Sequence, residues 1–178
     1  MLAIFAALAF MSSGCNPEPE PDPTRAELLT QPNGWQLTAG TSDPAYQLEL
    51  GVPITNLFDG FVAECELDDI LYFNQNGSEI LSFGKDEKTY PCEEEQTIKE
   101  KSLGNWALTE EDTKLKFYFP AYEEQVTATI ISLNETTLKL SLAISEDDGV
   151  EASPLYRGIR GSKTIRDYVF TLTYTYNK

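Results

Sequence analysis

Cysteine is the most reactive residue type in this chain, and its three copies stand in different contexts. Cys65 comes just before an apolar, aromatic-rich run at residues 70–73, and Cys92 follows a second segment, 78–83, that can pair with it. Asn76-Gly77 between the two segments is a strong β-hairpin signal, because Gly and Asn accept positive φ. A Cys65–Cys92 disulfide would join the two open ends of this hairpin, and the alternative is two free thiols.

Cys15 stands in a segment that is typical of export signals. Residues 1–11 are all apolar, a stretch too short to span a bilayer but suited to the hydrophobic region of a signal peptide. Ser12-Ser13-Gly14-Cys15 resembles the lipobox of bacterial lipoproteins, in which the Cys is lipidated once the signal is removed. We therefore predict a signal peptide at 1–14 and, at 15–25, the lipidated Cys and an extended Pro/acidic tether. The alternative is an ordinary signal peptide with a chance Cys.

The sequence contains no histidine, and this absence argues against most catalysis. It removes the commonest general base and zinc ligand, and with them Ser-His-Asp and Cys-His chemistry. Asp68-Asp69 could bind a hard cation, but no calcium-loop spacing surrounds the pair, and Asp at a turn more simply caps backbone N–H groups. A carboxylate-based glycan hydrolase is a further hypothesis. We predict a protein that is not an enzyme and binds no metal and no cofactor.

Charge is unevenly distributed along the chain. There are 13 Lys+Arg against 29 Asp+Glu, a net charge of −16, so the surface repels phosphate and nucleic-acid binding is excluded. Four basic residues gather within or just after the long connection at 145–165, and among them Arg157 and Arg160 are candidate contacts for an anionic group. The alternative is a solvated loop that balances nearby carboxylates.

Alternation of apolar and polar residues predicts eight strands and almost no helix. Thr24 can cap a helical turn at 24–29, and a second turn capped by Thr55 is expected within 55–61. The strands are expected at 33–38, 69–74, 79–83, 103–109, 113–119, 125–133, 136–144 and 167–176. Short turns between them favour an all-β fold, an eight-stranded antiparallel up-and-down β-barrel, with a β-sandwich as the rival.

Aromatic residues in phase on these strands are candidates for a ligand pocket inside the barrel. The alternative is a solidly packed core. The set consists of Trp35, Phe73, Phe83, Trp106, Phe117, Phe170 and Tyr174.

The order of these motifs resembles the lipocalin-like domains of small bacterial lipoproteins. The residues that carry the resemblance are Gly34-Trp35, Cys65, Asp68, Asp69, Phe73, Asn76-Gly77, Gly84, Cys92, Gly104, Trp106 and Leu108. The resemblance extends over residues 28–176. It implies a lipocalin-like meander barrel, a lipidated N-terminus, the Cys65–Cys92 disulfide and a site for a small hydrophobic ligand.

These features together predict a cell-envelope lipoprotein anchored in the outer membrane, on its periplasmic or surface-exposed side. Its domain at 26–178 would bind a small hydrophobic or amphipathic molecule without catalysis. The alternative is an interaction or scaffold module with a filled barrel that contacts a protein or glycan partner. We expect a monomer that reaches the membrane through its N-terminal lipid.

Overall fold

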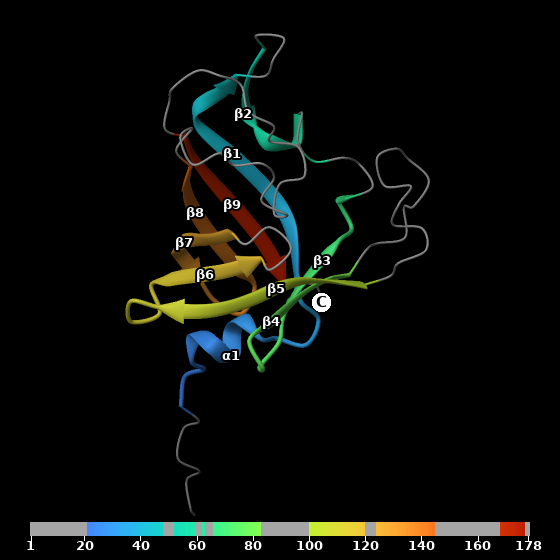
Figure 1. The fold of residues 1–178 in the computed structure, drawn as a ribbon, viewed down its shortest axis with the longest axis vertical. Helices are drawn as coiled ribbons and strands as arrows, with labels where there is room; N and C mark the ends of the chain where they lie inside the picture. Colours follow the sequence, from blue (N-terminus) through green and yellow to red (C-terminus); the bar gives the residue numbers. More distant parts are fainter. Residues whose placement is uncertain are drawn as a thin grey trace, which may run out of the picture.

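The computed structural model describes residues 21–47, 52–59, 62, 66–82, 100–119, 124–144 and 168–176. Figure 1 shows the fold. The elements are α1 (Arg25–Leu29), β1 (Trp35–Gln47), β2 (Pro53–Asn56), the 3-10 helix η1 (Leu57–Asp59), β3 (Ile70–Phe73), β4 (Ser78–Ser82), β5 (Glu100–Thr109), β6 (Lys114–Phe119), β7 (Glu124–Leu133), β8 (Thr137–Ile144) and β9 (Tyr168–Tyr176). The predicted signal peptide and Cys15 lie outside the described residues. No helix in the described ranges is long and apolar enough to cross a membrane.

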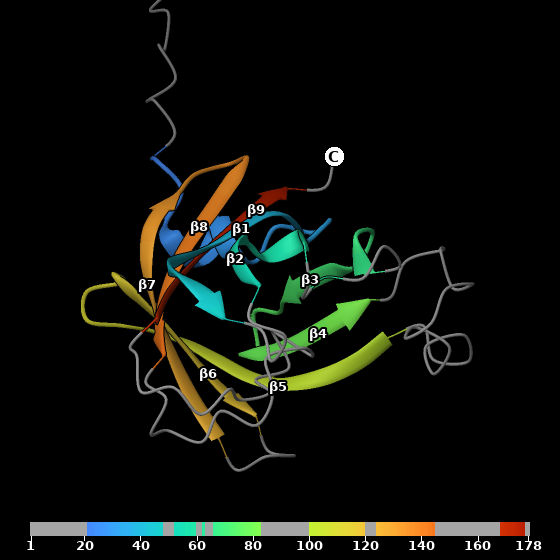
Figure 2. The same cartoon turned by 90° about the horizontal axis from the view of Figure 1, so that it is seen from above.

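Eight of the strands follow one another around a barrel. β3 to β9 pair antiparallel in chain order, β9 pairs along β1 from Trp35 to Asp43, and β1 pairs with β3. Figure 2 shows the strands arranged around the interior. The β1–β3 seam is only two residue pairs long, Trp35 with Leu71 and Gln36 with Ile70. The predicted antiparallel up-and-down architecture is confirmed.

The inner face of the barrel is apolar because the side chains alternate along each strand. On β9, Tyr168, Phe170, Leu172 and Tyr174 are buried, and on β8 Leu138, Leu140 and Leu142 are buried. Their neighbours on the other face are mainly Thr, Ser and Lys. One continuous hydrophobic cluster therefore forms the core.

The first strand is longer than predicted, and it carries an extra partner. β1 runs to Gln47 instead of ending at Thr38, and β2 pairs with its far half through Tyr46–Ile54 and Gln47–Pro53. Ser42-Asp43-Pro44 is typical of a turn, but it lies within the strand, where the β1–β2 register shifts between Thr41 and Tyr46. A bulge absorbs the proline, which has no N–H to donate.

The second predicted helical turn begins one residue later than expected. Asn56, and not Thr55, caps η1, because its Oδ1 accepts from the N–H of Phe58 at 3.2 Å. Its side-chain amide also donates to Asp59 at 3.0 Å. Leu57 of η1 is buried and packs on Gly40 of β1, where an added Cβ would lie 3.0 Å from Leu57 Cδ1.

Helix α1 covers one end of the barrel, the lower end in Figure 1. Thr24 and Glu27 form the reciprocal capping box, which confirms the predicted start. Leu29 is fully buried, and its carbonyl accepts from the indole N–H of Trp35 at 2.8 Å. At the other end of the helix, Arg25 donates to the carbonyl of Asp112 in the β5–β6 turn at 2.8 Å.

Gly34 is the residue that lets the chain pass from α1 into β1. Its φ is +69°, and a Cβ there would lie 2.5 Å from Ile70 Cγ2 and 2.9 Å from the carbonyl oxygen of Leu71. We expect Gly34→Ala to destabilise the protein by about 3 kcal/mol, from a strained φ and a clash with β3.

Gly77 provides a matched control for that change. It also has a positive φ, +83°, but the nearest atom to an added Cβ is 3.5 Å away. Gly77→Ala should cost only about 1 kcal/mol, from the φ alone. Urea denaturation measures both, and equal losses would contradict the close packing of Gly34 on β3.

The capping box gives the helix a dependence on pH. Hydrogen bonds from the hydroxyl and the backbone N–H of Thr24 lower the pKa of Glu27 below its usual 4.5. The folded state therefore favours the carboxylate, and this stabilisation is present above pH 4.5 and is lost as the pH falls through the folded-state pKa.

We expect wild type to be more stable than Glu27→Gln near neutral pH, and the difference to shrink in acid. Thermal unfolding across pH 3–7 tests this. The control is Glu135→Gln, because Glu135 is also exposed. A constant difference between wild type and Glu27→Gln over that range would count against the capping interaction.

Candidate ligand-binding site

The predicted pocket residues that the structure describes all face the interior. Trp35 comes from β1, Phe73 from β3, Trp106 from β5 and Phe117 from β6, while Phe170 and Tyr174 come from β9. All are buried except Trp106, which is partly exposed. Phe83 lies outside the described residues. The structure thus brings six of the seven candidates into one cluster.

Part of this interior is sealed from solvent. Seven of its side chains are fully buried, and we call them the sealed core. They are Trp35, Phe117, Phe170, Leu115, Leu138, Leu140 and Leu172. Trp35 also packs against Tyr176, edge to face, at a centroid distance of 5.9 Å. In this part of the interior the packed-core interpretation applies.

A second group of inward-facing residues remains accessible. Leu37, Trp106, Leu108 and Val126 pack against the core yet are only partly buried, and we call this group the open wall. Trp106 and Val126 flank Phe117 across three neighbouring strands, since Phe117 pairs with both. Leu37 follows the last pair of the β1–β3 seam. These four apolar side chains therefore pack on the core and keep part of their surface exposed to solvent.

The open wall is held rigidly at its aromatic corner. The indole N–H of Trp106 donates to the carbonyl of Asn74 at 3.1 Å, and its backbone N–H donates to Gly77 at 2.7 Å. Phe73 packs edge to face on Trp106 at 5.6 Å and lies 6.1 Å from Phe117. A fixed aromatic surface loses little conformational entropy when it binds an apolar group.

The chemistry of this interior is apolar. Among the described residues the buried side chains are aliphatic or aromatic except for that of Ser42, whose hydroxyl donates to the carbonyl of Pro44 at 2.7 Å. Asp68 is half-buried, and one of its carboxylate oxygens is buried. Nor do three His, Cys, Asp or Glu side chains gather into a potential metal site within those ranges. The described interior can take up apolar surface, but it offers no buried acid–base pair.

The pocket candidates predicted from the sequence did not include two buried aromatic residues near the start of β9. Tyr46 and Tyr168 are both buried, with ring centroids 5.0 Å apart, and Phe170 lies 6.2 Å from each. Tyr168 is in phase with Phe170 and could have been found by that signal. Tyr46 could not, because its strand was not expected to continue beyond Thr38.

Several predicted sites fall on residues that the structure does not describe. These are the lipidation site Cys15, the cysteines Cys65 and Cys92, and the anion contacts Arg157 and Arg160. Each remains a prediction from the sequence.

A comparison with protein families finds one match that covers most of the barrel. A family model described as a lipocalin-like domain matches residues 34–140, which is more than half of the chain. No curated protein and no solved structure matches the sequence. The matched range includes both tryptophans and every residue of the open wall.

The two tryptophans test the division between the sealed core and the open wall. Trp106→Phe leaves Trp35 as the only tryptophan, and Trp35→Phe leaves Trp106. Because Trp35 is fully buried and Trp106 is partly exposed, acrylamide should quench Trp106 more strongly, and Trp106 should emit at longer wavelength. Equal quenching in the two variants, both folded by circular dichroism, would contradict the division.

Proposed function

The chain belongs to the lipocalin-like domain family, and on that premise we propose that it is a non-catalytic binding protein of the cell envelope. Its barrel would hold a small hydrophobic or amphipathic molecule against the open wall. The observation that carries this proposal is the partial exposure of inward-facing Trp106, Leu37 and Val126 beside a sealed core.

The character of the open wall defines the ligand class. Aliphatic and aromatic side chains make up this group, and they pack against a hydrophobic core. Each buried CH₂ of a ligand would contribute about 0.8 kcal/mol. The ligand is therefore an apolar chain or ring system, and any polar end would remain at the solvent-exposed rim.

The place of action follows from the N-terminal segment. The lipobox-like Ser12-Ser13-Gly14-Cys15 supports lipidation at Cys15, and the Pro/acidic residues that follow support an extended tether. We propose that the barrel is thereby held near the outer membrane, where apolar molecules are abundant.

Binding of an apolar fluorophore tests the proposal. The full chain, held in a non-ionic amphipol without free detergent micelles, is titrated with N-phenyl-1-naphthylamine. Val126→Asn should weaken binding about 10-fold or more, because it puts an unpaired amide on the open wall.

Ile131→Asn is the matched control, because Ile131 lies on the same strand but faces outward, with 51% of its surface exposed. This change should leave the affinity unaltered. If Val126→Asn binds like wild type, the fluorophore does not bind at the open wall, and if wild type does not bind, the barrel is a filled scaffold. Either result makes the proposed function wrong.

A further inference from the structure

The outer surface of the barrel is rich in Thr and Lys over four strands. We define the outer face as the outward-facing residues of β6 to β9. They are Lys114, Lys116, Tyr118, Gln125, Thr127, Thr129, Ile131, Thr137, Lys139, Ser141, Ala143, Val169, Thr171, Thr173 and Thr175. Six of these residues are Thr and three are Lys, and none is Asp or Glu. All are partly or fully exposed. In a chain with 29 acidic residues, these positions carry no carboxylate, and the nearby Glu110 pairs with Lys114.

The pairing of the strands places hydroxyl groups beside lysines. Lys114 lies opposite Thr129, which in turn lies opposite Ser141, and Ser141 lies opposite Thr171. Lys139 lies opposite Thr173. Neighbouring strands are about 4.8 Å apart, so the side chains of these paired residues lie next to one another on the outer surface of the barrel.

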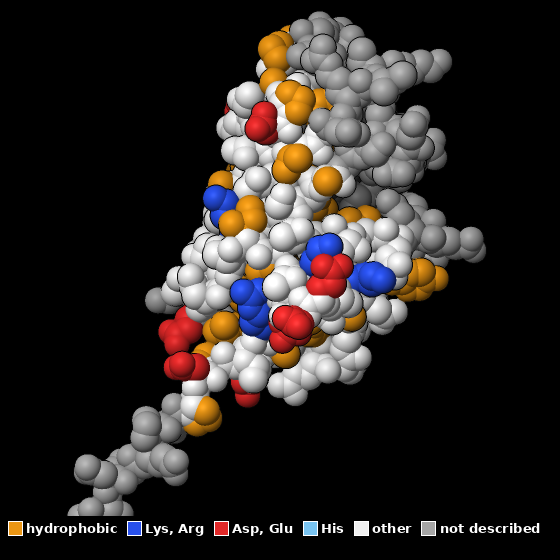
Figure 3. Space-filling model, turned by 90° about the vertical axis from the view of Figure 1, so that its left-hand side faces the viewer, with side chains coloured by type: hydrophobic (Ala, Val, Ile, Leu, Met, Phe, Trp, Pro, Cys, Tyr) orange, Lys and Arg blue, Asp and Glu red, His pale blue; other side chains and the backbone are white. Residues whose placement is uncertain are grey.

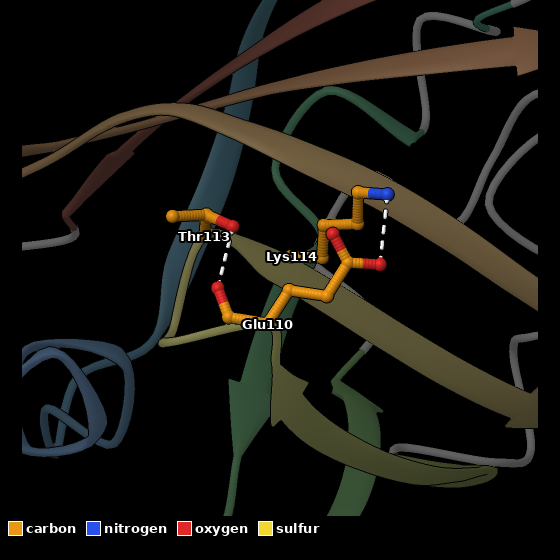
Figure 4. Close-up of polar contacts among 3 residues, drawn as sticks. All are labelled: Glu110, Thr113 and Lys114. Atoms are coloured by element: carbon orange, nitrogen blue, oxygen red, sulfur yellow. Dashed lines mark hydrogen bonds and ion pairs between the residues drawn. The ribbon is translucent and has the colours of Figure 1, made fainter.

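One of the three lysines is already engaged. Lys114 donates to Glu110 at 2.9 Å, at the edge where the β5–β6 turn begins, and Figure 4 shows this contact. The carbonyl of Glu110 accepts from the hydroxyl of Thr113 at 2.7 Å, which holds the turn in place. Within the described ranges, Lys116 and Lys139 form no ion pair. In Figure 3, which views the side of the molecule on the left of Figure 1, basic side chains lie across the middle of the surface with acidic side chains next to them.

An exposed aromatic ring completes the face. Tyr118 is 42% exposed, and on β6 it points to the same side as Lys116. It lies opposite Gln125 on one neighbouring strand and opposite Asn105 on the other. Rings of this kind pack against the C–H faces of sugars, while amides and hydroxyls bond to their hydroxyl groups.

We propose that the outer face binds an acidic glycan, a sugar chain that bears carboxylates. Lys116 and Lys139 would contact the carboxylates, Thr and Ser hydroxyls the sugar hydroxyls, and Tyr118 a sugar ring. The observation that supports this assignment is that Lys116 and Lys139 form no ion pair within the described ranges, at positions that include no Asp or Glu. Two unpaired lysines suit the sparse charges of such a glycan better than the dense phosphates of nucleic acid.

Calorimetry with a galacturonate oligosaccharide tests the proposal on the full chain in a non-ionic amphipol. The galacturonate should bind, and a neutral galactose oligosaccharide of equal length should bind more weakly. The double change Lys116→Gln, Lys139→Gln should weaken galacturonate binding about tenfold, and added salt should reduce the wild-type affinity. Tyr118→Ala should weaken both sugars.

Lys101→Gln is the matched control, since Lys101 is an exposed lysine of β5 away from the outer face. It should leave the affinity unchanged. No galacturonate binding, equal affinity for both sugars, or an equal loss with Lys101→Gln would overturn the proposal. Self-association that the double variant abolishes, seen by sedimentation, would assign the face to a second copy and would also overturn it.

The outer face is independent of the proposed interior site. Variants of Lys116, Lys139 and Tyr118 should keep the wild-type affinity for N-phenyl-1-naphthylamine, and Val126→Asn should keep the affinity for galacturonate. The two titrations therefore distinguish a failure of one proposal from a failure of the other.

Discussion

Trp35 provides the contact on which the rest of the barrel depends. Its backbone pairs with Leu71 of β3 on one side and with Tyr176 of β9 on the other, so the ring of strands closes at this residue. Its indole is fully buried and donates to the carbonyl of Leu29, which holds α1 across the end of the barrel. Breaking this buried hydrogen bond would lower the free energy of unfolding by about 1–3 kcal/mol. The closure of the barrel and the docking of α1 on its end therefore both depend on Trp35.

Closure at Trp35 also decides where the interior stays accessible. The β1–β3 seam ends after Gln36, and β1 then follows β9 and β2 away from β3. Leu37 and the wall around Trp106 are left partly exposed, while the leucines of β8 and β9 are packed. The two tryptophans therefore differ in role. Trp35 is part of the packed core, and Trp106 keeps part of a fixed apolar surface exposed.

Much of the fold could be predicted because the local pattern and the tertiary structure agree. Alternation such as Leu138, Leu140 and Leu142 with Lys139 between them fixes both the strand and its inner face. The far half of β1 and the strand β2 could not be predicted, since Ser42-Asp43-Pro44 is locally typical of a turn and only pairing with β2 and β9 extends the strand. The inward direction of Trp106 could be predicted from its phase, but its accessibility depends on how β1 leaves β3, which no local pattern contains. The polar phase of each of the strands β6 to β9 could be predicted from the alternation, but their arrangement beside one another on the outer face depends on strand pairing.

The central claim is that the open wall holds an apolar molecule inside the barrel of this lipocalin-like protein. Native mass spectrometry of the protein, purified from the cells that make it, tests this most directly. The account predicts a population carrying one additional small-molecule mass, which Val126→Asn removes and Ile131→Asn retains. The mass of the protein with no additional molecule bound, in wild type and both variants alike, would contradict it.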